Sequence, residues 1–141
     1  MHEALLITHF LGLALGLGTG FAMMTLGQAT RDMAPADRGA FMKRAMALSR
    51  NGSVGLLLLL VSGVGLVMIY GVAAVMALGG GLFHLKLTLV VILLGVFGYM
   101  QVLVRQARGG ATAAMARIPV LSRIMLFLST AIVIVAVLAF N

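Results

Sequence analysis

Four long apolar stretches constrain this chain more than any other feature of its sequence. They cover residues 4–28, 53–78, 82–104 and 119–140, and as helices each is long enough to cross the roughly 30 Å hydrocarbon core of a bilayer. Only 9% of the 141 residues are charged, against about 25% in a typical soluble domain, which is too few to cover a water-facing surface. The sequence therefore predicts an all-α integral membrane protein of one domain, residues 1–141, that contacts membrane lipid over most of its length.

The basic side chains predict how these helices are oriented. Most of them lie between the first and second stretches or between the third and fourth: Arg31, Arg38, Lys43, Arg44, Arg50, Arg105, Arg108 and Arg117. Because basic loops stay in the cytoplasm, we expect an up-down-up-down four-helix bundle with both termini on the outer, periplasmic side of a bacterial inner membrane. The net charge of +7 is explained by this topology and by contact with anionic lipid, and no nucleic-acid partner is expected.

The connections between the stretches carry further signals. Pro35 predicts the start of a short helix, which is either an amphipathic helix on the membrane surface or an extension of the second span. A run of three glycines at residues 79–81 predicts a tight second connection. Pro119 suits the first turn of the fourth helix.

Two histidines and one lysine are the candidates for chemistry within the spans. His9 lies in the outer part of the first stretch, and His84 and Lys86 lie near the outer end of the third. In a cyclic bundle the first and third helices are diagonal neighbours, so we expect the two histidines to face one another at similar depth. Histidine is a common axial ligand of haem iron, so both are candidate metal ligands, and Lys86 is placed to pair with a haem propionate. The alternatives are a hydrogen-bonded core histidine, a solvated histidine and a lysine that reaches the membrane surface.

A strip of glycines follows His9 on one face of the first helix. Gly12, Gly16 and Gly20 come three, seven and eleven residues after it, and those offsets share a face. Gly95 extends the corresponding face of the third helix. Residues without side chains leave a flat groove in which a planar ring can lie, so these four glycines are candidate haem-binding positions. Close packing of helices is the alternative interpretation, because small residues four apart are typical of helix interfaces in membranes.

Three segments of the chain resemble a family of membrane haem proteins. They are ITHFLGLALGLGTGF (7–21), LFHLKLTLVVILLGVFGYM (82–100) and RIPVLSRIMLFLSTAIVIVAVLAF (117–140). The histidine in the first helix, the His-x-Lys-Leu motif that opens the third and the proline-led fourth helix are similar to those of the HemJ-type protoporphyrinogen oxidases and the related CopD-like copper-resistance membrane proteins. The resemblance covers the whole chain in outline.

The resemblance implies roles for particular residues. HemJ-type proteins bind b-type haem through the first-helix histidine, which corresponds to His9, and their His-x-Lys motif corresponds to His84 and the catalytic candidate Lys86. The resemblance also implies oxidation of protoporphyrinogen IX to protoporphyrin IX, with electrons passed to the respiratory chain. This chain differs from the family in having no tryptophan, in carrying Phe97 near the place of a second histidine, and in having Leu-Ala-Phe (138–140) where the family has Lys-Pro-Phe.

Two other functions fit the same sequence. A CopD-like copper-handling protein would use His9 and His84 with Met68 or Met76 as ligands. A packing subunit of a larger membrane complex, or a homo-oligomer, would use the glycine faces as interfaces. The absence of cysteine excludes disulfides and thiolate metal sites. The three acidic residues lie outside the spans, which disfavours a carboxylate-based hydrolase or proton pump.

Overall fold

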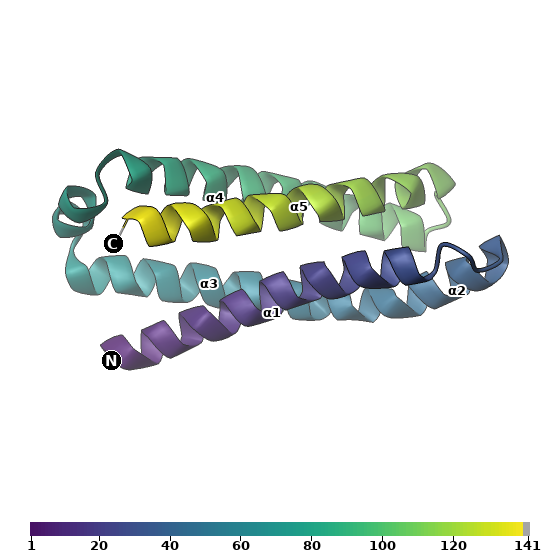
Figure 1. Cartoon of the computed structure of the whole chain (residues 1–141), viewed down its shortest axis with the longest axis horizontal. Helices are drawn as coiled ribbons and strands as arrows, with labels where there is room; N and C mark the ends of the chain where they lie inside the picture. Colours follow the sequence, from purple (N-terminus) through teal and green to yellow (C-terminus); the bar gives the residue numbers. More distant parts are fainter. Residues whose placement is uncertain (140–141) are drawn as a thin grey trace. The chain divides into compact units, whose positions relative to one another are not determined.

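The computed structural model describes residues 1–139, and every regular element in that range is a helix (Figure 1). The elements are α1 (His2–Ala29), α2 (Pro35–Ala45), the 3₁₀ helix η1 (Met46–Leu48), α3 (Ser49–Tyr70), α4 (Val72–Arg108) and α5 (Thr112–Ala139). Four helical stretches are long and apolar enough to cross a membrane: His2–Ala29, Pro35–Tyr70, Val72–Arg108 and Thr112–Ala139. The predicted all-helical character is therefore confirmed, as is the presence of four helices long and apolar enough for a multi-pass membrane protein. The last residue of the fourth predicted span, residue 140, lies outside the described residues.

The first of two compact units, Met1–Val72, is an antiparallel helical hairpin. After a turn at residues 30–34, α2, η1 and α3 return beside α1 (Figure 1). Residues that lie opposite one another have numbers that total between 70 and 72: His2–Tyr70, Leu5–Gly65, His9–Ser62, Gly12–Leu59, Gly16–Gly55, Thr19–Gly52 and Thr30–Met42. Up to Thr19, the α1 members recur at alternating intervals of three and four residues, which is the 3.5-residue period of a left-handed helix pair. We call this line of contacts the α1–α3 seam.

The short helix α2 begins at Pro35, as predicted. The first residue of a helix has no helical carbonyl to which its N–H could donate, so a proline there costs no hydrogen bond. The 3₁₀ turn η1 then joins it to α3. Of the two interpretations of this segment, the structure shows the extension of the second span, because Pro35–Tyr70 forms a helical stretch of 36 residues. At 1.5 Å per residue that stretch is about 54 Å long. It therefore exceeds the roughly 30 Å hydrocarbon thickness, so part of it would lie outside the hydrocarbon core if this helix spans a membrane.

The second predicted span ends earlier than expected, at Tyr70 rather than near residue 78. The cause is Gly71, which adopts φ 82° and ψ 139°, a conformation that residues with a side chain rarely adopt. The chain then forms a short helical segment at residues 72–79 and breaks again at Gly80, where φ is 49° and ψ −139°. The predicted triple-glycine connection is thus the second of two breaks.

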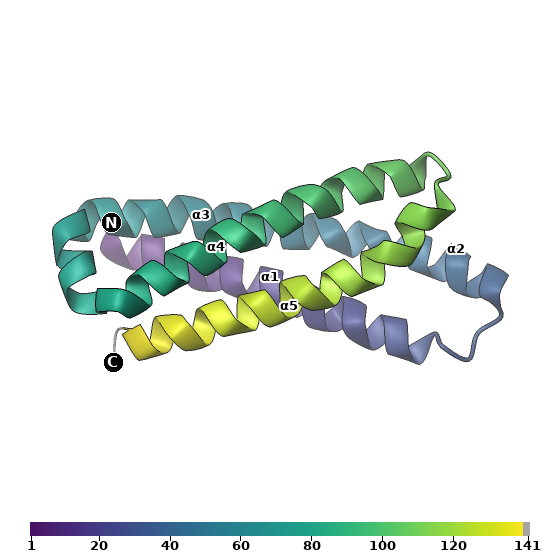
Figure 2. The ribbon, with the colours of Figure 1, turned by 90° about the horizontal axis from the view of Figure 1, so that it is seen from above.

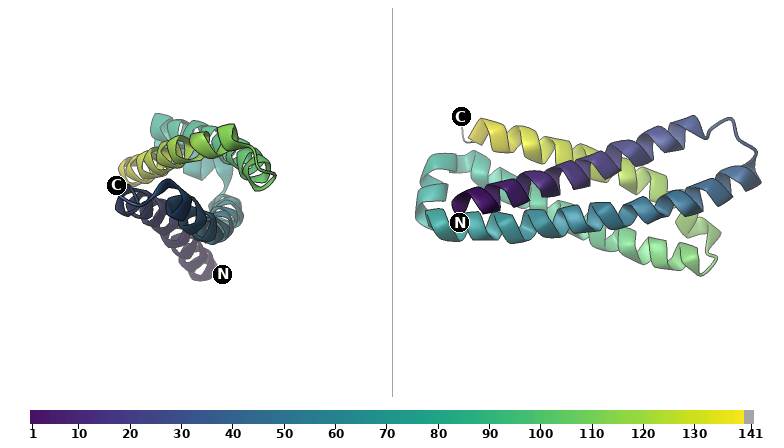
Figure 3. Two further views of the ribbon diagram at one scale, coloured as in Figure 1. Left: turned by 90° about the vertical axis from the view of Figure 1, so that its right-hand side faces the viewer. Right: turned by 90° about the horizontal axis from the view of Figure 1, so that it is seen from below.

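The second compact unit comprises α4 after Val72 and α5, which run antiparallel (Figures 2 and 3). Glycines form the turn between them, and Gly110 has a φ of 94°. Across this pair the Arg117 guanidinium donates a hydrogen bond to the Tyr99 hydroxyl at 3.2 Å. Pro119 lies inside α5 and not in its first turn as predicted, because the alanine-rich segment that precedes it has high helix propensity and is already helical.

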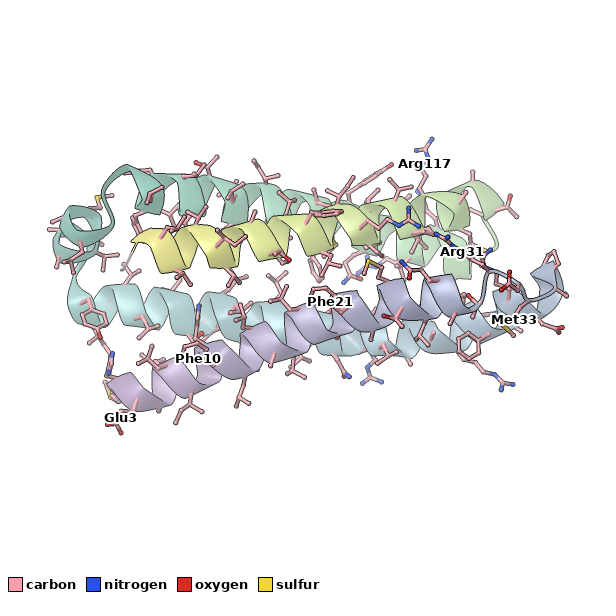
Figure 4. All side chains as sticks on the ribbon, viewed as in Figure 1. Glu3, Phe10, Phe21, Arg31, Met33 and Arg117 are labelled. Atoms are coloured by element: carbon pink, nitrogen blue, oxygen red, sulfur yellow. The ribbon has the colours of Figure 1, made fainter. Side chains whose placement is uncertain are left out.

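Large apolar side chains are exposed along the helices. On α1, Phe10 is 64% exposed and Phe21 is 49% exposed (Figure 4). Glu3 lies at one end of this helix, and Arg31 and Met33 lie beyond the other. An apolar surface of this kind is unfavourable in water but suits hydrocarbon, so the distribution of side chains agrees with a membrane environment.

Candidate functional site

His9 on α1 is held by α3 within the first unit. Its Nδ1 lies 2.9 Å from the Ser62 hydroxyl oxygen, and Ser62 has no exposed surface. A methyl group added to Gly63 would lie 3.6 Å from His9 Cε1, so the imidazole lies against the backbone of α3 where that helix has no side chain. The α1–α3 seam therefore fixes the position of this ring.

The Ser62 hydroxyl is itself bonded to its own helix. It donates to the Leu58 carbonyl one turn earlier and has a longer contact of 3.3 Å to the Leu59 carbonyl. Sequence reasoning did not identify Ser62, although one signal was present. Ser62 is an isolated hydroxyl in a run of leucine and valine, seven residues after Gly55, which places both on one helix face.

The glycine strip has two different environments. Gly12 is buried, and a Cβ there would lie 2.8 Å from the Gly55 carbonyl oxygen and 2.9 Å from the Leu59 nitrogen. The α3 backbone therefore occupies the space beside Gly12, and at this position glycine allows the helices to pack closely. Gly16 and Gly20 are half-buried, and no described atom lies within 4 Å of a Cβ built on Gly16. Haem contact at Gly16 and Gly20 stays a prediction.

His84 and Lys86 belong to the second unit, on the part of α4 that begins after Gly80. His84 is exposed, and its carbonyl accepts a hydrogen bond of 2.9 Å from the Thr88 hydroxyl. Lys86 is half-buried. The approach of these two residues to His9 stays a prediction.

Two further candidate positions lie on exposed surface. Gly95 on α4 has no described atom within 4 Å of an added Cβ. Met68, proposed as a copper ligand, is 78% exposed near the end of α3. Residues 1–139 contain no group of three or more histidine, cysteine or acidic side chains placed to hold a metal ion.

His2 has a partner that the sequence did not suggest. The Tyr70 hydroxyl is hydrogen-bonded to His2 Nε2, and the two rings meet edge to face with centroids 5.2 Å apart. This contact closes the α1–α3 seam at the end that carries the N-terminus. It also separates the roles of the first-unit histidines, because His2 lies at the end of the hairpin while His9 lies two turns inside it.

In comparisons with known proteins, no family model, curated protein or solved structure matches this chain.

Proposed function

We propose that this chain is a haem b-binding redox protein of the bacterial inner membrane, in which His9 would hold the haem iron. One observation carries the proposal, which is the imidazole of a membrane-spanning helix held by the buried hydroxyl of Ser62. Ionisable side chains are rare inside membranes and usually functional. Metal-binding histidines in turn commonly use one ring nitrogen to bond a second group that orients the ring.

The residues present suit haem better than a bare metal ion. A haem brings four of its own nitrogen ligands and needs only one or two from the protein, and the described part of the chain offers single histidines rather than clusters. His84 is the proposed second ligand, and Lys86 the proposed partner of a propionate. Haem, when bound, supplies one-electron transfer. The protein's part is to hold the ring by His9 and to exclude water from it within the apolar helices.

The proposed reaction is the oxidation of protoporphyrinogen IX to protoporphyrin IX, as the HemJ resemblance implies. Six electrons and six protons leave each porphyrinogen, and three molecules of a membrane quinone take up two of each and become quinol. Lys86 is the proposed catalytic residue because it lies two positions from His84 and is half-buried. A protein of this kind needs no soluble domain, since the quinone is apolar and the porphyrinogen has an apolar macrocycle that can enter the membrane with its propionates at the surface.

An absorption spectrum of the detergent-purified protein tests the haem proposal. We expect a Soret band in the wild type, loss of that band in His9→Ala, and an unchanged band in His2→Ala, the matched control whose ring bonds Tyr70 at the hairpin end. Full haem retention in His9→Ala would reject this ligand. Bound copper without haem would support a CopD-like role, and larger partners purified without either cofactor would support a packing subunit.

We also propose that the helices alternate in direction, with both termini on the outer side and the basic loops in the cytoplasm. The chain has no cysteine, so single cysteines report topology without background. A membrane-impermeant maleimide added to intact spheroplasts should label Glu3→Cys. It should label Met33→Cys and Ala111→Cys only after permeabilisation, since the basic loops would lie inside. The opposite labelling pattern would reverse the proposed orientation.

A further inference from the structure

We infer that Ser62 is a positioning residue that fixes the tautomer of His9, so that Nδ1 carries the proton and Nε2 is the metal-binding nitrogen. The consequence for haem ligation rests on the proposed function. The hydrogen-bond arrangement itself is a property of the protein alone. Ser62 thereby gains a role that the sequence-based candidates, His9, His84 and Lys86, did not include.

The number of hydrogen atoms decides the direction of each bond. A serine hydroxyl has one hydrogen to donate, and a backbone carbonyl can only accept. The Ser62 oxygen lies within hydrogen-bond distance of the Leu58 carbonyl, so its one hydrogen points to that carbonyl. The contact of 2.9 Å between Ser62 Oγ and His9 Nδ1 must then have the hydrogen on the imidazole, with Ser62 accepting.

The tautomer has a chemical consequence at the other ring nitrogen. With the proton on Nδ1, the neutral imidazole has its lone pair on Nε2, which is the form that ligates a metal. A hydrogen bond donated from Nδ1 also makes the ring more electron-rich and a stronger ligand to oxidised iron. The two hydrogen bonds, from His9 to Ser62 and from Ser62 to the Leu58 carbonyl, would thus orient the imidazole ring. They would also lower the reduction potential of a bound haem.

The burial of Ser62 makes this arrangement specific. The side chain has no exposed surface, so the position of its hydroxyl has no contact with bulk solvent. If the hydroxyl is removed, the Nδ1–H of His9 would lose the Ser62 hydroxyl as its acceptor, and the loss of a hydrogen bond in an apolar environment is costly. The ring would be expected to move its proton to Nε2, which removes the ligating lone pair from that nitrogen.

The first test needs no haem. We expect nitrogen NMR of ¹⁵N-histidine-labelled protein in detergent at about pH 8.5, where imidazoles are largely neutral, to show His9 with a protonated Nδ1 and an unprotonated Nε2. Ser62→Ala should abolish this pattern. Ser49→Ala, which removes a similar hydroxyl from the same helix far from His9, should preserve it. A wild-type His9 protonated on Nε2, or an unchanged pattern in Ser62→Ala, would overturn the inference.

The second test uses the haem-loaded protein. Ser62→Ala should weaken haem affinity by about 10- to 100-fold and raise the midpoint potential, while Ser62→Thr, which keeps a hydroxyl, should restore the potential towards the wild-type value. A midpoint potential unchanged in Ser62→Ala would refute the role of Ser62 in tuning the ligand. A wild type that takes up no haem would instead refute the proposed function, and the NMR result would still decide the tautomer.

Discussion

The close approach of α1 and α3 at Gly12 and Gly55 predicts a large effect from a single methyl group. A Cβ on Gly12 would lie 2.8 Å from the Gly55 carbonyl oxygen, and a Cβ on Gly55 would lie 2.6 Å from the Gly16 nitrogen. Ordinary van der Waals contact begins near 3.4 Å, so the helices would have to separate by about 0.6 to 0.8 Å. Because the obstructing atoms belong to backbone, no side chain can move aside.

The expected cost follows from overpacking, which typically destabilises a protein by about 1–3 kcal/mol. Alanine also has higher helix propensity than glycine by about 1 kcal/mol, which partly offsets the strain. We therefore expect Gly12→Ala and Gly55→Ala each to lower the free energy of unfolding by about 0–2 kcal/mol relative to the wild type, and by about 1–3 kcal/mol relative to an alanine variant with the same propensity gain and no clash. The double variant should cost less than the two single effects together, because once the helices have separated the second methyl meets less resistance.

The assay is equilibrium unfolding by SDS in mixed micelles, followed by loss of helical circular dichroism. Gly18→Ala is the matched control, since it adds the same methyl to the same helix where no described atom lies within 4 Å. The control should be as stable as the wild type or slightly more stable. Equal stability of Gly12→Ala and Gly18→Ala would refute the close crossing and with it the register of the α1–α3 seam.

Three further predictions follow from other parts of the chain. Gly80→Ala should destabilise the protein by about 1–3 kcal/mol, because alanine is strained at a φ of 49°, while Gly81→Ala should be near neutral; equal melting temperatures would contradict this. Tyr70→Phe removes the hydroxyl bonded to His2 and should speed hydrogen exchange in the first turn of α1 by a few-fold, whereas unchanged exchange would mean that the contact does not hold the helix end. Pro119→Ala restores an N–H inside α5 and should raise the melting temperature; a lower melting temperature would show that the proline is needed.

Hydropathy predicted the existence of the four long helices but not all of their boundaries. The segment that follows Gly71 is as apolar as the helix before it, so a hydropathy pattern runs through both. The break depends on the single backbone conformation of Gly71, which a glycine permits but does not require. The prediction that Pro119 lies in the first turn of its helix was wrong for a similar reason. A first helical turn tolerates proline, but a proline does not have to mark a first turn.

The candidate site was predictable only in part. His9 was identified because an imidazole is conspicuous in an apolar helix, but its partner Ser62 was not. The choice between a haem groove and helix packing at Gly12 also needed coordinates. It depends on which residue of the second helix lies opposite, and composition carries no information on that register. Packing was one of the two interpretations of the glycines, and at Gly12 it is the observed one.

The register of the hairpin shows why membrane interfaces need a different search from soluble ones. In water the residues between two helices are the apolar ones, but in lipid every face is apolar, and the interface is marked by small and polar residues. The α1–α3 seam follows this rule, with His9 opposite Ser62, Gly16 opposite Gly55, and Thr19 beside Gly52. Such residues on the first helix recur every three or four positions. A stripe of small and polar residues therefore indicates which helix faces meet, while the register that places Ser62 opposite His9 comes from the structure.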